Sequence, residues 1–233
     1  MTLLAIKHLR FAWEENAPLL AIDAFELKRA EKVFLKGPSG CGKTTLLNLI
    51  GGVLAPQQGR IELLGQNLPT LSPSARDRFR ADHLGFMFQQ FNLLPFLSVE
   101  QNILLGCRFS TLREKRATHL YGSLRGCIHA LLEALQLPSA LFKKPAYTLS
   151  IGQQQRVAAA RALLGAPELI IADEPTSALD ADNRHAFLTL LFNQCHAQGS
   201  SLLLVSHDSS LANRFNRALS LPDLNQATPQ GIV

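Results

Sequence analysis

The amino-acid sequence predicts an α/β fold, in which a mostly parallel β-sheet is covered by helices and carries an inserted helical lobe. Short segments at 169–172 and 201–205, apolar except for Ser201, are typical of parallel strands buried on both faces. Helical spacing of apolar residues accompanies them at 150–164 and 181–198. Between residues 98 and 147 strand patterns disappear, and leucines and alanines recur at helical spacing at 127–137, which predicts a helix there and a helical lobe.

The N-terminal third is expected to contain short strands joined by turns. The strands are predicted at 4–11, 25–27, 32–36, 60–64 and 84–88, and a helix is predicted at 44–50, ended by Gly51 and Gly52. We expect one domain over residues 1–233. Within it, 1–97 and 150–223 form a β subdomain and a core, 98–149 form the helical lobe, and 224–233 form a loosely ordered tail.

The composition limits the classes of partner. The net charge of the chain is +5. Its basic residues lie in short clusters, whereas a nucleic-acid binder more often has a continuous basic stripe, so no nucleic-acid partner is expected. The four cysteines are far apart and form no metal-binding pattern, as in a cytosolic protein with reduced thiols. The N-terminus does not read as a signal peptide, and no segment is apolar enough to span a bilayer. If the protein acts at a membrane, another chain must supply the membrane part.

Residues 37–44 match the phosphate-binding pattern G-x-x-x-x-G-K-[ST], between a predicted strand and a predicted helix. Glycines let the backbone turn so that successive N–H groups point at phosphate oxygens, and the helix adds the positive end of its dipole. Lys43 is expected to neutralise the β- and γ-phosphates, and the Thr44 hydroxyl suits Mg²⁺. The candidate nucleotide-binding residues here are Gly37, Pro38, Ser39, Gly40, Cys41, Gly42, Lys43, Thr44 and Thr45.

The apolar segment 169–172 ends in two carboxylates, Asp173 and Glu174. A parallel sheet presents ligand groups at the carboxyl ends of its strands. Asp173 is suited to hold the hydration shell of Mg²⁺, and Glu174 to orient or deprotonate an attacking water. Taken alone, the segment would be an ordinary strand followed by a polar turn; the phosphate-binding pattern favours the catalytic interpretation.

The segment Leu149-Ser150-Ile151-Gly152-Gln153 begins another predicted helix. Ser150 and Gln153 fit a capping box, which is a sufficient local reason for both residues. The segment also resembles the Leu-Ser-Gly-Gly-Gln signature of the ABC ATPase family. The resemblance implies that Ser150, Gly152 and Gln153 contact the γ-phosphate of a nucleotide held by a second ATPase subunit, since a helix start is an anion site. Ile151 departs from the family pattern and adds bulk at that surface.

Other segments resemble the family's remaining motifs. Gln89 resembles the glutamine of the Q-loop, Asp180 ends a segment similar to the D-loop at the dimer interface, and His207 resembles the switch histidine that contacts the γ-phosphate. Trp13 matches the aromatic residue that stacks on adenine, with Phe11 as its competitor for that role. The resemblance spans roughly residues 3–221. The residues expected near the metal are Thr44, Gln89 and Asp173. The histidines His83, His119 and His129 are expected to be surface residues.

The family resemblance implies a RecA-like P-loop NTPase core with an N-terminal antiparallel β subdomain and an inserted α-helical subdomain. It further implies an enzyme that hydrolyses ATP with Mg²⁺, in a dimer that moves a membrane permease from the cytoplasmic face of the inner (plasma) membrane. The segment 86–102 is similar to the branch that serves lipoprotein release, macrolide export and cell division. Its apolar part, Phe91–Leu97, is expected either to pack in the core of the lobe or to receive the permease.

Two alternatives differ from a transport role. The first is a soluble ABC-class ATPase acting on nucleic acid or ribosomes. Repair members of that class carry a long coiled-coil insert and ribosomal members carry two ATPase domains, and this sequence has neither. The second is a small-molecule kinase with the same phosphate loop. Residues 150–153 and His207 argue against it.

Overall fold

The computed structural model describes residues 1–14 and 17–227. The chain divides into two compact units, Met1–Arg80 with Leu203–Val233, and Ala81–Leu202. The residues expected to form the helical lobe, 98–149, belong to the second unit, together with elements that the sequence assigns to the core.

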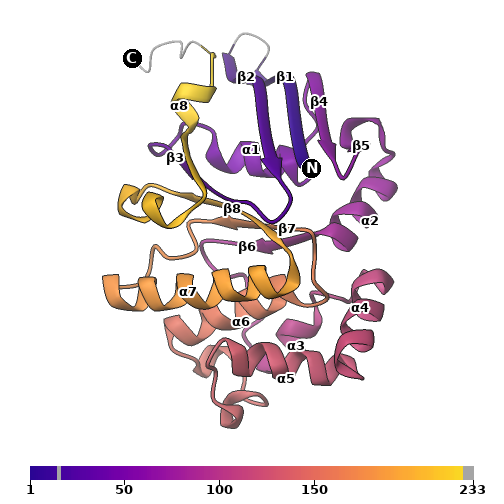
Figure 1. The fold of residues 1–233 in the computed structure, drawn as a ribbon, viewed down its shortest axis with the longest axis vertical. Coiled ribbons are helices and arrows are strands. Elements are labelled where there is room, and N and C mark those ends of the chain that lie inside the picture. Colours follow the sequence, from indigo (N-terminus) through magenta and orange to yellow (C-terminus); the bar gives the residue numbers. More distant parts are fainter. Residues whose placement is uncertain (15–16, 228–233) are drawn as a thin grey trace. The chain divides into compact units, whose positions relative to one another are not determined.

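The first unit contains a four-stranded antiparallel sheet in the order β2-β1-β4-β5 (Figure 1). The strands are β1 (Thr2–Glu14), β2 (Ala17–Lys28), β4 (Gln58–Leu63) and β5 (Gln66–Asn67). Ile6 lies opposite Phe25 on one side and Ile61 on the other, and all three side chains are buried. Cross-strand apolar contacts of this kind stabilise one face of a sheet. The predicted N-terminal antiparallel subdomain is therefore confirmed.

The same unit carries the segment that leads into the phosphate-binding pattern. Strand β3 (Lys32–Lys36) runs parallel to β9 (Arg217–Ser220), and helix α1 (Lys43–Ile50) follows β3. This unit also contains the 3₁₀ segments Leu68–Thr70 and Ser209–Arg214, most of helix α2 (Pro73–His83), most of strand β8 (Ser201–Ser206), and α8 (Leu221–Leu224). After α8, the Asn225 side chain hydrogen-bonds to the backbone of Leu19 and Ala21 on β2, and residues 228–233 of the expected tail lie outside the described residues.

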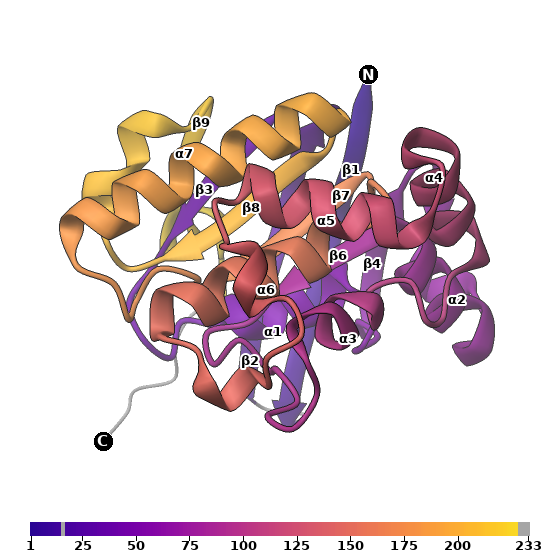
Figure 2. The same cartoon turned by 90° about the horizontal axis from the view of Figure 1, so that it is seen from below.

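The second unit is built around helix α6 (Ile151–Leu163). Strand β6 (Leu84–Met87) pairs in parallel with β7 (Leu169–Asp173). Helix α6 packs against β6 and against three helices (Figures 1 and 2), which are α3 (Val99–Leu104), α5 (Leu124–Ala134) and α7 (Ala181–Gln198). A Cβ atom added at Gly85 would lie 2.3 Å from the Ala162 carbonyl oxygen, so glycine is what lets β6 approach the backbone of α6. Strand β8 (Ser201–Ser206) is buried along its whole length.

The structure adds helix α4 (Thr111–Tyr121) in a stretch where the sequence shows no helical apolar pattern. It also moves the helix predicted at 127–137 to Leu124–Ala134, because the Ser123 hydroxyl accepts a hydrogen bond from the N–H of Gly126 and starts the helix earlier. The helix ends before Gln136, whose φ of 55° is incompatible with a continuing right-handed helix.

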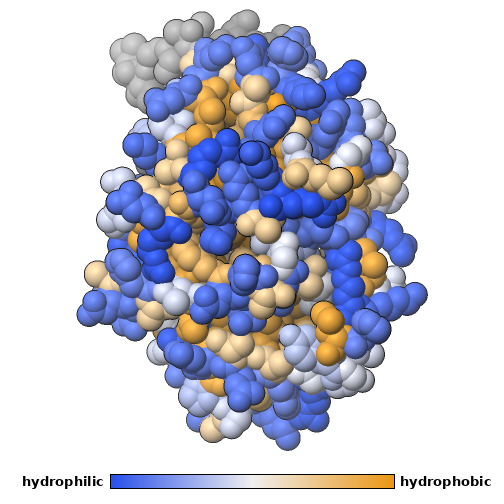
Figure 3. Space-filling model, in the orientation of Figure 1, coloured by the Kyte–Doolittle hydropathy of each residue, from blue (hydrophilic) through white to orange (hydrophobic). Residues whose placement is uncertain are grey.

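The surface seen in Figure 3 is dominated by hydrophilic side chains with small apolar areas between them. Within residues 1–14 and 17–227, no helix has both the length and the apolar character needed to cross a bilayer.

Candidate nucleotide-binding and catalytic site

The phosphate-binding pattern has the predicted context, with strand β3 before it and helix α1 after it. Gly40 and Gly42 have φ angles of 80° and 97°, a region that disfavours residues with a Cβ atom. At Gly42 a Cβ would also lie 2.9 Å from the Leu20 side chain. The sequence therefore places glycine where the backbone must turn tightly into a helix.

The N-terminus of helix α1 has the features of an anion-binding site. Gly42 occupies its N-cap position, no side chain caps the helix, and its first turn contains no acidic residue. The positive end of the helix dipole is thus left for a ligand rather than neutralised by the chain. The Lys43 ammonium group lies over the loop and donates hydrogen bonds of 2.8 Å to the carbonyl oxygens of Gly37 and Pro38. Thr44 is exposed at the same helix start.

The two aromatic candidates for adenine stacking differ in exposure. Trp13 is 65% exposed, whereas Phe11 is 6% exposed. Their rings meet edge to face with centroids 5.1 Å apart, so Phe11 packs beneath Trp13. Trp13 also lines a cavity of about 350 Å³ together with Pro18 and Gln57. Phe11 also lines this cavity, but Trp13 is the ring with most of its surface exposed.

The carboxyl ends of β6 and β7 bring three candidate residues to one edge. Met87 is paired with Ala172, so Gln89 follows β6 at the edge where Asp173 and Glu174 end β7. Gln89 is exposed, Asp173 is half-buried and Glu174 is 8% exposed. Glu174 also has a left-handed φ of 48°, which is unusual for a residue other than glycine and is typical of functional sites.

The N-terminus of α6 has the predicted capping box. The Ser150 hydroxyl accepts a hydrogen bond from the N–H of Gln153 at 3.4 Å, and the Gln153 side chain accepts one from the Ser150 N–H at 3.0 Å. Ser150 is exposed and Ile151 is 53% exposed. No atom lies within 4 Å of a Cβ built on Gly152. The helix start is therefore an open surface, with Ile151 as its most prominent apolar side chain.

Asp180 has a structural role that the motif alone did not indicate. It is the N-cap of α7, where its carboxylate accepts hydrogen bonds from the backbone N–H of Asn183 at 2.9 Å and from the Asn183 amide at 2.7 Å. The backbone hydrogen bond from Asn183, followed by its side-chain bond, lowers the pKa of Asp180. His207 is exposed directly after β8, in the first unit.

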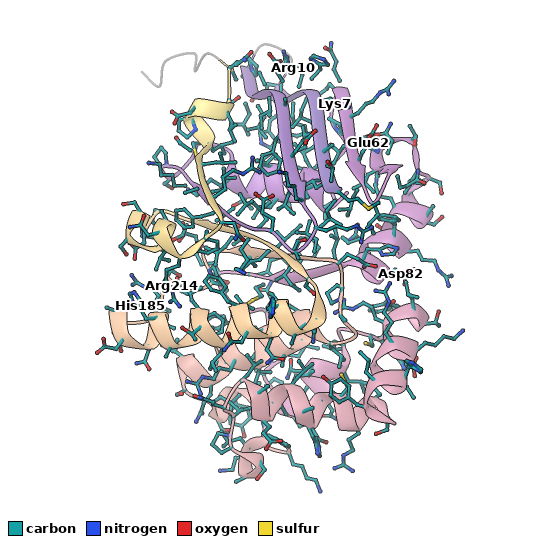
Figure 4. All side chains as sticks on the ribbon, in the orientation of Figure 1. Lys7, Arg10, Glu62, Asp82, His185 and Arg214 are labelled. Carbon is teal, nitrogen blue, oxygen red and sulfur yellow. The ribbon has the colours of Figure 1, made fainter. Side chains whose placement is uncertain are left out.

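The expectation that His83, His119 and His129 are surface residues is wrong for His83. Its ring lies 3.0 Å from the Glu168 carboxylate, which also accepts hydrogen bonds from Arg116 at 2.7 and 3.3 Å. Beside this group, Ser110 donates a hydrogen bond to Asp82 at the end of α2 (Figure 4). Periodicity could not reveal these contacts, because they join polar residues far apart in the sequence.

Asn102 is a buried polar residue that sequence reasoning missed. Its side chain is fully buried and bonds to the backbone of Leu94 in both directions, and it also donates to the carbonyl oxygens of Leu97 and Ser98. It thereby fixes the loop between β6 and α3. Its one sequence signal is its position four residues after Ser98, the N-cap of α3.

Comparison with known proteins decides the family. The family model described as "ABC transporter" matches residues 20–177. The chain belongs to the ABC transporter ATPase family. It is an ATP-binding and ATP-hydrolysing domain, and the predicted RecA-like P-loop fold is confirmed.

The relatives agree with the branch expected from residues 86–102. The chain is 37% identical to the macrolide export ATP-binding/permease protein MacB of Hyphomonas neptunium, over 92% of the chain and 32% of that protein. It is 40% identical to the ABC transporter ATP-binding protein YbbA of Escherichia coli K12, over 84% of the chain and 82% of YbbA. The chain thus spans about a third of the MacB relative's length.

Solved structures show the same fold. The dimeric bacterial ABC transporter cassette MJ0796 matches with a TM-score of 0.78 and 31% identity, over 93% of both chains. A post-hydrolysis dimer of MJ0796 bound to ADP and Pi matches with a TM-score of 0.78 and 30% identity, over 98% and 97% of the two chains. These comparisons give no support to a nucleic-acid or ribosomal role.

Proposed function

We propose that this chain is the ATP-driven subunit of a membrane ABC system. Two ATPase subunits close around two ATP molecules, hydrolysis reopens them, and the motion is passed to an integral membrane permease. The observation that carries the proposal is the exposed N-terminus of α6, a capped helix start that places Ser150 at the surface. An exposed helix start can receive a phosphate group that a second subunit brings.

The proposed roles within one subunit follow from the local chemistry. Trp13 stacks on adenine, and residues 37–45 with Lys43 hold the phosphates. Glu174 orients or deprotonates the attacking water, while Gln89 and His207 respond to that water and to the γ-phosphate. Glu174 is only 8% exposed, so most of its side chain is shielded from bulk water.

The proposed roles across the dimer belong to Ser150, Gly152 and Gln153, with Asp180 at the interface. The open space at Gly152 leaves room for a phosphate to approach the helix start. Ile151 is the side chain that the second subunit must accommodate, because more than half of it is exposed at this point.

The residues present fit Mg²⁺. The expected donors are the Thr44 hydroxyl, the Gln89 amide and the Asp173 carboxylate, all of which are hard oxygen ligands. Among residues 1–14 and 17–227, no group of three or more His, Cys, Asp or Glu side chains forms a metal site by itself. A Mg²⁺ ion that is held mainly by nucleotide phosphates and water needs only such isolated ligands, and it would supply charge neutralisation.

The loop between β6 and α3 fits a docking surface for the permease. Phe91 is buried, whereas Leu94 and Phe96 are 49% and 85% exposed. The Phe96 ring lies 6.1 Å from the ring of Tyr147, which is itself 62% exposed. Part of the segment 91–97 therefore packs inside the unit, and part forms an apolar surface suited to a helix from a membrane protein. Docking of this kind would hold the chain at the cytoplasmic face of the inner membrane.

A Glu174→Gln variant tests the proposal. Because the variant keeps the phosphate contacts and loses water activation, it should accumulate as a dimer with ATP and turn over at least about 100-fold more slowly than wild type. Sedimentation velocity with and without ATP measures the dimer, and phosphate release measures turnover. Lys43→Ala is the matched control, because it should fail to dimerise with ATP. A Glu174→Gln chain that stays monomeric and hydrolyses ATP normally would contradict the assigned roles.

A further inference from the structure

Two backbone segments next to the candidate catalytic residues adopt left-handed conformations. Phe91 and Asn92, just after Gln89, have φ angles of 58° and 48°. Glu174 has a φ of 48°. Residues with a Cβ atom adopt this region at an energetic cost, so neighbouring groups must hold them there.

Arg161, near the end of α6, holds the first segment. Its guanidinium donates hydrogen bonds of 2.6 Å to the carbonyl oxygens of both Phe91 and Asn92. Burial lowers the pKa of Arg161, but the group stays charged at neutral pH. Hydrogen bonds from a charged donor are stronger than neutral ones, and one planar group that bonds two successive carbonyl groups fixes the turn between them.

Gln155, in the second turn of the same helix, holds the second segment. Its side chain is fully buried and its amide donates a 2.6 Å hydrogen bond to the carbonyl oxygen of Pro175, the residue after Glu174. Gln155 and Arg161 are six positions apart, which is about 600° of helical rotation, so they point to different sides of α6. One helix therefore reaches both segments.

We propose that Gln155 and Arg161 are positioning residues through which α6 sets the geometry of Glu174 and of the Gln89 loop. The helix that carries them begins at Ser150, so a phosphate bound at its start and the residues that act on water are joined by one rigid element. The inference rests on the roles proposed above for Gln89, Glu174 and Ser150. Both positioning residues are inferred to act through backbone carbonyl groups, those of Pro175, Phe91 and Asn92.

The test replaces each side chain by methionine, which keeps length and apolar packing but removes the donors. We expect Arg161→Met and Gln155→Met to lower kcat about 10- to 100-fold, because small displacements of reacting groups have effects of this size. The Kd for a fluorescent ATP analogue should stay within about twofold of wild type, since the phosphate loop is untouched. Arg161→Lys, which keeps the charge but has one nitrogen in place of two, should have an intermediate kcat.

Arg156→Met is the matched control. Arg156 lies on the same helix and donates a 2.9 Å hydrogen bond to the carbonyl oxygen of Gln136, which also has a left-handed φ of 55°. Its partner is remote in sequence from Gln89 and Glu174. The control should lose stability on thermal denaturation but keep its kcat.

A second variant separates positioning from general stability. Glycine adopts left-handed angles readily, so Asn92→Gly in the Arg161→Met chain should recover part of the lost kcat. Equal kcat values in wild type, Arg161→Met and Gln155→Met would overturn the inference, as would a parallel loss in Arg156→Met. If the Arg161→Met chain does not fold, the Arg161→Lys chain provides the test, and a wild-type kcat in that chain overturns the inference. A wild-type chain without ATPase activity would instead overturn the proposed function.

Discussion

At the scale of single residues, both the backbone angle and the nearby side chain of Leu20 favour glycine at position 42. The φ of Gly42, 97°, lies outside the range of residues with a side chain, and a Cβ there would lie 2.9 Å from Leu20. A Gly42→Ala chain should lose about 1–2 kcal/mol of unfolding free energy and should also lose ATP binding, because the loop must shift to relieve the contact. Urea denaturation and equilibrium binding of a fluorescent ATP analogue measure the two effects.

Gly199→Ala is the control for backbone strain alone. Gly199 follows α7 with a φ of 68°, and nothing lies within 4 Å of a Cβ built there. It should have a similar stability cost and bind ATP as wild type does. ATP binding by Gly42→Ala at wild-type affinity would show that the loop tolerates the methyl group.

At Ile151 the side chain, rather than the backbone, is expected to affect dimerisation and ATPase activity. It is 53% exposed in the first turn of α6, where the family has glycine. Replacing it by alanine removes the bulk and keeps helix propensity, so Ile151→Ala should dimerise with ATP at a protein concentration about threefold or more below that of wild type. Ile151→Gly should do the same with about 0.5–1 kcal/mol lower stability, because glycine weakens the helix. Sedimentation velocity over a range of concentrations checks both, and identical dimerisation and ATPase rates in all three chains would show that the bulk has no consequence.

At the scale of elements, the sequence predicts the helices and strands that have a complete apolar pattern. It misses the helices that polar contacts stabilise. Strand β3 and helix α7 begin and end at the predicted residues. Helix α4 was missed because Arg113, which any pattern assigns to the surface, is 3% exposed. Its guanidinium donates to the carbonyl oxygens of Leu84, Leu164 and Ala162 at 3.1, 2.8 and 2.8 Å, and burial lowers its pKa to about 10.

The residues of the candidate site also fall into a group that the sequence could predict and a group that it could not. Contiguous motifs such as 37–44 and 173–174 could be predicted, because a single turn or strand end fixes their geometry. Arg161 and Gln155 could not, since their partners are backbone carbonyl groups of Phe91, Asn92 and Pro175. Every residue has a backbone carbonyl group, so the residue types of these partners do not reveal the hydrogen bonds.

Glu168 makes the attachment of α4 dependent on pH. Burial raises the pKa of this carboxyl group, but hydrogen bonds from His83 and Arg116 outweigh it and bring the pKa to about 2, below its ordinary value of 4.5. A carboxyl group whose folded pKa is depressed contributes stability that is present above its unfolded pKa and is lost as pH falls through the folded one. The stability of wild type should therefore fall between about pH 4.5 and pH 2.

A Glu168→Gln chain should have about 2 kcal/mol less unfolding free energy at pH 7, because Arg116 and His83 lose their charged partner. It should also show a weaker decline in stability between about pH 4.5 and pH 2, the window set by the unfolded and folded pKa values of Glu168. Urea denaturation at several pH values measures both. A variant with the same pH dependence as wild type would show that other carboxyl groups cause the decline.

At the scale of the whole molecule, the proposed dimer makes each nucleotide site a composite of two subunits. A Lys43→Ala subunit lacks the phosphate lysine and keeps Ser150; a Ser150→Arg subunit keeps Lys43 and loses the helix start. Neither homodimer has a complete site, whereas a mixed dimer has one, built from Lys43 of one subunit and Ser150 of the other. An equal mixture should therefore regain ATPase activity, and each mixed dimer should have about half of the wild-type rate, because one of its two sites is complete. Phosphate release from the separate and mixed chains measures the effect, with differently tagged subunits to verify that mixed dimers form. If mixed dimers form and remain as inactive as the parents, Ser150 does not act on the partner's nucleotide, and the exposed start of α6 needs another explanation.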